Sequence, residues 1–198
     1  MVFSANDQTN LQSPVFAVTR DDRARLLRCP SKVVWLTGLS GAGKSTLANA
    51  LEQFMHSKGR LTYILDGDNI RGGLNRDLGF DQTSRDENIR RAAEVARLMA
   101  DAGVTVLAAF ISPLVRQRET ARRVIGDKDF IEIYVSTPLE ICRRRDPKGL
   151  YGKALQGGIQ AMTGIDSEYE APRNPHLIVD TSIETTASAV ARISKLLR

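Results

Sequence analysis

The chain has 198 residues, of which 42% are hydrophobic, and this is enough to bury one core, so we expect a single domain. Lysine and arginine outnumber aspartate and glutamate by 28 to 23, which favours an anionic partner, while the lack of a helix-turn-helix or basic–aromatic pattern argues against nucleic acid. The lack of long apolar runs argues against a membrane span or a signal peptide, and the isolated Cys29 and Cys142 fit a cytoplasmic protein with reduced thiols.

The first 28 residues are polar and show no periodicity. We interpret residues 1–28 as a flexible extension, with a short helix expected near residues 21–27, and residues 29–198 as the folded domain. Short apolar runs bounded by turn residues then predict buried strands at residues 33–37, 62–65, 104–110, 130–135 and 177–179. Segments with helical periodicity separate the runs. This alternation predicts an α/β fold of three layers, with helices on both faces of a parallel sheet.

A glycine-rich segment follows the first expected strand and fits the pattern G-x-x-x-x-G-K-[ST]. Its candidate nucleotide-binding residues are Gly38, Ser40, Gly41, Ala42, Gly43, Lys44, Ser45 and Thr46. A helical pattern over residues 46–58, ended by Gly59, comes next. The glycines let backbone N–H groups converge on a phosphate at a helix N-terminus, where Lys44 would reach the β- and γ-phosphates of a nucleotide and Ser45 would bind Mg²⁺. This arrangement is typical of the P-loop NTPase fold.

Polar residues also follow the second and third expected strands, and open α/β sheets bind ligands beyond the carboxyl ends of their strands. Asp66 and Asp68 could hold Mg²⁺ through water or accept a proton from an attacking hydroxyl, and Arg71 could hold an acidic substrate. The same residue types are also common in turns. Ser112 could contact a transferred phosphoryl group, or it could cap a helix whose first residue would be Pro113.

Three patterns of the form S/T-x-x-E predict helix starts. They begin at Ser84, Thr137 and Thr181, and the first of them precedes an expected helix over residues 85–102 that Gly103 would end. Residues 146–175, about 30 in number, are instead rich in glycine, proline and charge, with little periodicity. So long an irregular segment in a compact domain is usually functional, and we predict a mobile lid over the nucleotide site.

The chain carries an ordered set of short motifs. Besides GLSGAGKST at residues 38–46, these are LDGDNIR (65–71), GLNRDLGF (73–80), SRDENIRRAAEVA (84–96), FISP (110–113), RDPKGLY (145–151) and TGIDSEYEAP (163–172). The set covers about residues 32–175 and closely resembles the adenylylsulfate kinase (APS kinase) family. The resemblance implies an enzyme that uses MgATP to phosphorylate the 3′-hydroxyl of adenosine 5′-phosphosulfate in sulfate assimilation. It also implies a homodimer.

The resemblance further implies roles for individual residues. Lys44 and Asp68 would be catalytic, Asp68 by orienting the acceptor hydroxyl and accepting its proton, and Ser112 occupies a position described in the family as a phosphoserine intermediate. Phe80 would lie against the adenine of the acceptor. The residues expected to contact the acceptor are Asp68, Asn69, Arg71, Phe80, Arg85, Asn88, Ile111, Ser112, Lys148, Ala161 and Met162.

Three features depart from the family pattern, one of which is the clustered basic run from Arg143 to Arg145, a segment that is usually mixed in charge. Family members usually carry a larger residue where this chain has Gly72, and a phenylalanine that closes on the acceptor adenine where it has Met162. These changes leave an alternative open, a kinase of the same fold that acts on a different activated nucleotide. A nucleotide-dependent switch of the GTPase kind is not expected, because the sequence lacks the Asn-Lys-x-Asp motif that recognises the base in such proteins.

Overall fold

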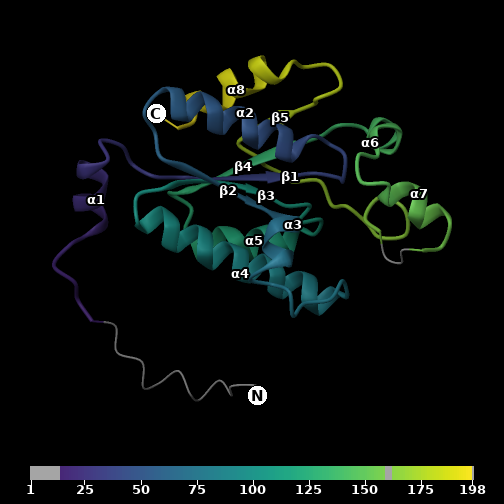
Figure 1. Ribbon diagram of the computed structural model, residues 1–198, viewed down its shortest axis with the longest axis horizontal. Coiled ribbons are helices and arrows are strands. Elements are labelled where there is room, and N and C mark those ends of the chain that lie inside the picture. Colours follow the sequence, from purple (N-terminus) through teal and green to yellow (C-terminus); the bar gives the residue numbers. More distant parts are fainter. Residues whose placement is uncertain (1–13, 159–161, 198) are drawn as a thin grey trace.

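A parallel β-sheet forms the centre of the molecule in the computed structural model, which describes residues 14–158 and 162–197 (Figure 1). Within these ranges five strands pair in the order β2-β3-β1-β4-β5, and every pairing is parallel. The strands are β1 (Val33–Thr37), β2 (Thr62–Asp66), β3 (Thr105–Ala109), β4 (Phe130–Val135) and β5 (Leu177–Val179). The sheet confirms the predicted α/β class, and its strand bounds lie close to those expected.

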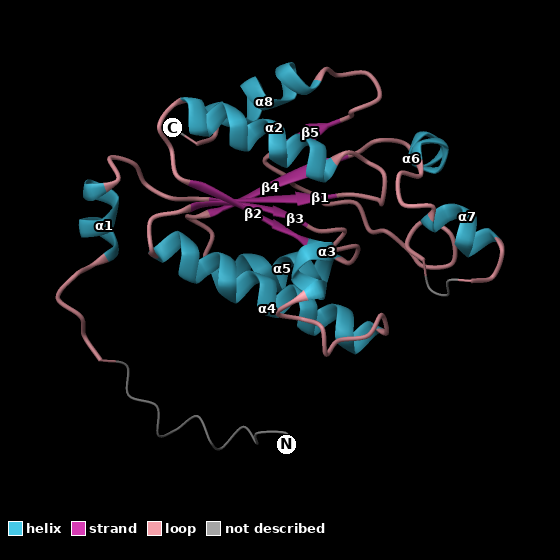
Figure 2. Ribbon diagram, viewed as in Figure 1, coloured by secondary structure: helices cyan, strands magenta, loops and turns pink. Residues whose placement is uncertain are grey.

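Helices cover both faces of the sheet (Figure 2). One face carries α2 (Lys44–Ser57) and α8 (Thr186–Lys195), and the other carries α4 (Gln82–Asp101) and α5 (Val115–Ile125). The shorter helices are α1 (Arg20–Leu26), α3 (Gly67–Gly72), α6 (Leu139–Arg145) and α7 (Leu150–Leu155). The helices α6 and α7 lie beyond the carboxyl ends of the strands, where open α/β sheets bind ligands, and α1 lies at the opposite edge.

The central strand β1 explains why the apolar run at its position is continuous. All of its residues are buried, and their side chains alternate between two cores. Val34 and Leu36 belong to the core on the α2–α8 face, whereas Val33 and Trp35 belong to the core on the α4–α5 face. A parallel strand that is covered on both sides has no polar face, so its sequence shows no alternation of apolar and polar residues.

The three predicted capping boxes are wrong. Helix α4 begins earlier than expected because Asp81 caps it, accepting a hydrogen bond from the Ser84 backbone N–H at 3.0 Å. Helix α8 is capped by Thr185 rather than Thr181. Helix α6 begins at Leu139 with no side-chain cap from Thr137. The pattern identifies residues that are able to cap a helix, but tertiary contacts decide which of several capable residues does so.

Two other boundaries differ from the sequence-based expectation. Helix α2 begins at Lys44 rather than residue 46, because the glycine-rich loop runs directly into its first turn. The segment 146–175 is not irregular throughout, since it contains α7 and a compact turn closed by an isolated bridge between Thr163 and Ser167.

Helix α1 is fastened to the rest of the domain by ion pairs. Arg20 pairs with Asp129, and Arg23 pairs with Asp101 at 2.8 Å. The expected short helix near residues 21–27 is therefore present, while residues 1–13 lie outside the described residues. The division of the chain at residue 28 stays a prediction. No helix in the described ranges is long and apolar enough to cross a membrane.

Candidate active site

A cavity of about 1100 Å³ opens at the carboxyl ends of the strands. Its walls come from the glycine-rich loop after β1, the segments after β2 and β3, the first half of α4, and residues of the 146–175 segment. A space of this size holds ligands as large as nucleotides, and its position is the one expected for an open α/β sheet. The cavity thus brings together the motifs that the sequence places far apart.

The backbone of the glycine-rich loop passes very close to the end of β4. At Gly38, where φ is +152°, an added Cβ would lie 2.4 Å from the carbonyl oxygen of Val135. At Gly43, φ is +100°, a left-handed conformation that places the loop directly in front of the first turn of α2. Glycine is required at both positions, and the loop lies beside the cavity at the N-terminus of α2. The backbone N–H groups of a helix N-terminus favour an anion at such a place.

Side chains that follow two other strands, and one from α7, form hydrogen bonds with carbonyl groups of the loop. The hydroxyls of Thr137, after β4, and Thr181, after β5, lie 3.0 and 2.8 Å from the carbonyl oxygen of Ala42. The phenol of Tyr151 in α7 donates to the carbonyl oxygen of Ser40 at 3.0 Å. Contacts from three other segments of the chain therefore fix the conformation of the loop.

Lys44 is the cation of this loop. Its ammonium group is buried and donates hydrogen bonds to the carbonyl oxygens of Gly38 and Leu39, both at 2.8 Å. Burial, and after it the positive charge of Lys148, lower the pKa of Lys44 to about 8. A polyphosphate in the cavity would supply the opposite charge that the buried ammonium lacks, so Lys44 gains from binding an anion.

Ser45 and Asp66 meet at the edge of the loop. The Ser45 hydroxyl donates to the Asp66 carboxylate at 2.6 Å, and the other oxygen of Asp66 caps α3 by accepting from the Asp68 N–H at 3.0 Å. No group of three or more His, Cys, Asp or Glu side chains suited to a metal is found among the described residues. Two hard oxygen donors beside a phosphate site fit Mg²⁺, which takes its other ligands from water and phosphate.

The opposite wall of the cavity carries the predicted acceptor residues. Phe80 is 68% exposed, and its ring lies 4.4 Å from the guanidinium carbon of Arg71, which also donates to the carbonyl oxygen of Gly79 at 2.8 Å. Lys148 forms an ion pair with Asp68 across the cavity. An aromatic face, two cations and a carboxylate are thus gathered opposite the phosphate loop, an arrangement suited to an anionic group attached to a flat ring.

Most of the other predicted acceptor residues also line the cavity. These are Arg85, Asn88, Ile111, Ser112 and Met162. The buried Asn88 accepts a hydrogen bond from the Asn75 amide at 3.0 Å, and Met162 is packed into the core on the α2–α8 face. Asn69 is exposed on α3 and is not part of the cavity wall that the described residues form. Ala161 lies outside the described residues.

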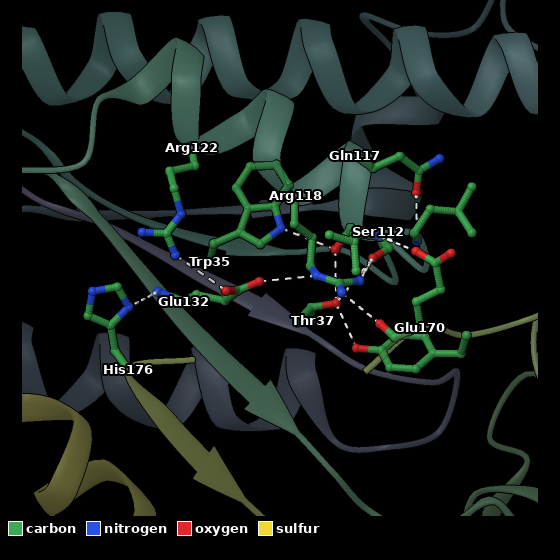
Figure 3. A network of polar contacts seen from close by, with 12 residues as sticks. Trp35, Thr37, Ser112, Gln117, Arg118, Arg122, Glu132, Glu170 and His176 are labelled. Carbon is green, nitrogen blue, oxygen red and sulfur yellow. Dashed lines mark hydrogen bonds and ion pairs between the residues drawn. The ribbon is translucent and has the colours of Figure 1, made fainter. Parts of the chain in front are cut away.

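Ser112 does not cap a helix, as one reading of the sequence predicted. Helix α5 begins at Val115, with Leu114 at its N-cap position. Ser112 is only 2% exposed and has a φ of +38°, which is rare for a residue with a side chain. Its hydroxyl accepts a hydrogen bond from the Trp35 indole at 3.1 Å and donates to Thr37 at 3.0 Å (Figure 3). These inward contacts take the hydroxyl away from the start of the helix.

Sequence reasoning missed the part of the cavity beyond the loop. Arg145, Thr181, Glu184 and Thr186 line it there, and Arg145 donates to the Thr181 hydroxyl at 2.7 Å. Thr181 could have been predicted from the sequence, because it comes just after the last expected strand. The rule that strand ends carry ligand-binding residues applies to β4 and β5 as well as to β2 and β3.

Comparisons with known proteins point to one family. The family described as Adenylylsulphate kinase matches residues 30–180. An adenylyl-sulfate kinase from Clostridium acetobutylicum is 48% identical over 190 residues, covering 96% of this chain and 94% of that protein. The bifunctional enzyme NodQ of Rhizobium tropici is 53% identical over 96% of this chain, which spans only 30% of NodQ. The structure of the Mycobacterium tuberculosis APS kinase CysC in complex with AMPPNP and APS matches with a TM-score of 0.82 and 48% identity, over 85% of this chain and 98% of CysC.

We predict that affinity for ATP falls as the pH rises through about 8, the pKa of Lys44 in the free protein. Above that pH, Lys44 must take up a proton to bind the polyphosphate, so the binding constant should fall by up to about tenfold per pH unit. Calorimetric titration with a non-hydrolysable ATP analogue measures this dependence. In the control variant Lys44→Arg the guanidinium stays charged, so the pH dependence should disappear. The same slope in both proteins would contradict the prediction.

Proposed function

The chain belongs to the adenylylsulphate kinase family, and we propose that it transfers the γ-phosphoryl group of ATP to the 3′-hydroxyl of adenosine 5′-phosphosulfate. The product, 3′-phosphoadenosine 5′-phosphosulfate, places the enzyme in sulfate assimilation. The observation that carries the proposal is that one cavity contains both the phosphate loop and the set Asp68, Arg71, Phe80 and Lys148. The relative that was solved with AMPPNP and APS binds a donor analogue and this acceptor together.

The donor side of the cavity holds and neutralises the phosphates of ATP. The loop amides and the Lys44 ammonium bind the β- and γ-phosphates, and Ser45 and Asp66 are the residues that would hold Mg²⁺. When bound, Mg²⁺ neutralises charge on the β- and γ-phosphate oxygens. Phosphoryl transfer passes through a loose transition state with charge spread over three oxygens, so positioning and electrostatics supply most of the catalysis.

The acceptor side orients the attacking hydroxyl. Asp68 lies in the first turn of α3 next to Asp66, and it accepts the proton of the 3′-hydroxyl as the phosphoryl group arrives. In the absence of ligand the ammonium of Lys148 neutralises Asp68. The phosphosulfate of the acceptor draws Lys148 and Arg71 to itself, which leaves the Asp68 carboxylate available to the hydroxyl. The ring of Phe80, backed by Arg71, gives the adenine a flat surface.

The departures from the family pattern do not favour a different acceptor. A Cβ at Gly72 would meet no atom within 4 Å in the described structure, and Gly72 is not among the residues found lining the cavity. Met162 does line the cavity, but its side chain is buried in the core on the α2–α8 face, so it supplies an apolar edge at a position where the family resemblance leads us to expect an aromatic ring. The usual acceptor therefore remains the best-supported substrate.

Three further features form part of the proposal. The segment 146–175 closes over the bound nucleotides as a lid, which excludes water as a competing acceptor. The protein is cytoplasmic, in keeping with two free cysteines, of which Cys142 is buried.

The protein also forms a homodimer, in keeping with large exposed apolar side chains near the described N-terminal end, such as Phe16 and Leu26. Sedimentation velocity would test whether the protein is a homodimer, and a single species with the mass of one chain would contradict it.

Steady-state assays with ATP as donor test the proposed reaction. We expect adenosine 5′-phosphosulfate to be phosphorylated with a kcat/KM at least about tenfold above that of AMP, which lacks the sulfate that Lys148 and Arg71 would bind. Lys44→Ala should lower kcat by on the order of 100-fold or more, because a charge that stabilises the migrating phosphoryl group is lost. Its melting temperature should stay near that of the wild type. Preference for another nucleotide would instead support the alternative acceptor.

The buried environment of Ser112 argues against a phosphoserine intermediate. Its hydroxyl already donates to Thr37, and the hydrogen bonds described for it include no carboxylate or imidazole that could take its proton. We predict that Ser112→Ala remains active and that the wild type incorporates no label from γ-phosphate when the acceptor is absent. The variant should lose about 1–3 kcal/mol of stability in urea, because the buried Trp35 N–H is left without a partner. Trapping of labelled Ser112 at the rate of turnover would refute this prediction.

A further inference from the structure

A buried charge network contacts Ser112, one of the residues that line the cavity (Figure 3). At its centre is Arg118 of α5, whose side chain is 3% exposed and whose Nε lies 3.1 Å from the carboxylate of Glu132 in β4. The same guanidinium donates through Nη1 to the carbonyl oxygen of Ser112 at 2.7 Å, and through Nη2 to the carbonyl oxygen of Glu170 at 2.6 Å. One side chain therefore links a strand, the turn after β3 and the end of the 146–175 segment.

Residues at the end of this segment are fixed to the same place by further contacts. The backbone N–H of Glu170 donates to the carbonyl oxygen of Pro113 at 2.8 Å, and the Glu170 carboxylate accepts from the Val115 N–H at 2.5 Å. The phenol of Tyr169 lies 2.9 Å from the Thr37 hydroxyl, which in turn accepts from Ser112. Burial raises the pKa of Tyr169, so its hydroxyl stays protonated at neutral pH. The ring of Tyr169 also stacks on Tyr134 at 5.8 Å between centroids.

A compact turn connects this anchor to the cavity wall. The N–H of Gly164 donates to the carbonyl oxygen of Ser167 at 2.8 Å, and the N–H of Ser167 donates to the carbonyl oxygen of Met162 at 3.1 Å. Met162, Thr163 and Ser112 all line the cavity. Two parts of the cavity wall that come from distant parts of the sequence are thus attached to the same buried network.

We propose that Arg118 and Tyr169 are positioning residues, which hold the Ser112 turn and the Met162–Thr163 wall at the spacing that the acceptor requires. This inference depends on the proposed function only for the identity of the acceptor, adenosine 5′-phosphosulfate. Neither side chain is part of the cavity wall as the described residues define it. The two residues would therefore act on substrate binding indirectly, by fixing the positions of Ser112 and of the end of the 146–175 segment. The network also sustains the unusual φ of +38° at Ser112, because it binds both the carbonyl and the hydroxyl of that residue.

The chemistry of the network requires arginine at position 118. A planar guanidinium can pair with the Glu132 carboxylate on one side while it donates hydrogen bonds to the carbonyl oxygens of Ser112 and Glu170 on others, whereas an ammonium is a compact charge that cannot match this geometry. Arg122 provides a matched control. It lies one turn further along α5 and reaches the same Glu132 carboxylate at 3.4 Å from a partly exposed position. Its other contacts described here are with Asp127 and with the ring of Phe130, away from Ser112 and the 146–175 segment.

The experiment compares Arg118→Lys and Tyr169→Phe with the control Arg122→Lys. We expect the KM for adenosine 5′-phosphosulfate to rise about tenfold or more in the first two variants, because small displacements of a binding wall are costly. The KM for ATP should stay within about twofold of the wild type, and the control should leave both constants unchanged. Tyr169→Phe keeps the stacked ring and removes only the hydroxyl, so it tests the anchor even if Arg118→Lys fails to fold.

Hydrogen exchange gives a readout that does not depend on the reaction. The amides of Gly164, Ser167 and Glu170 should exchange faster in Tyr169→Phe and Arg118→Lys than in the wild type or in Arg122→Lys. Unchanged exchange, an unchanged acceptor KM, or a parallel rise in the KM for ATP would overturn the inference. If the wild type does not phosphorylate adenosine 5′-phosphosulfate, the proposed function fails by itself, and the exchange measurement still decides whether these residues hold the two walls.

Discussion

The close approach of Gly38 to the carbonyl oxygen of Val135 is the constraint on which the site depends. The loop can turn from β1 into α2 only because no side chain stands at that point. Once it has turned, the carbonyl of Ala42 comes within reach of the hydroxyls that follow β4 and β5. Lys44 is then enclosed by the carbonyls of its own loop. The anion site is therefore a product of sheet packing, so the fold and the binding of phosphate cannot be separated.

The parts of the structure that the sequence predicts well are those with a local physical cause. The apolar run at β1 reflects burial on both faces, and the glycine-rich motif reflects a backbone that admits no Cβ. Asp66 and Asp68 were found because they follow a strand. Thr137 and Thr181 follow strands too, but their spacing to a glutamate also fits a capping box, and the tertiary contact with Ala42 prevailed over that local preference.

The parts that the sequence does not reveal depend on residues that meet only in the folded state. Arg118 belongs to a helix rich in arginine, where charged residues usually face water. It is buried because the packing of α5 on the sheet sets it opposite Glu132, and each of these charges makes the burial of the other tolerable. The left-handed backbone of Ser112 has the same origin, since no glycine or asparagine marks it in the sequence. Most residues of the cavity wall could therefore be proposed from sequence motifs, but the network that supports them could not.

The position of α1 bears on how this domain combines with others. Helix α1 is tied to Asp129 and Asp101 at the edge of the sheet where the strands begin, and α8 returns the chain to that same edge after β5 (Figure 1). The cavity opens at the other edge. The first and last helices that the structure describes therefore leave the mouth of the cavity uncovered. This separation suits a fold that also matches 30% of the length of the bifunctional enzyme NodQ.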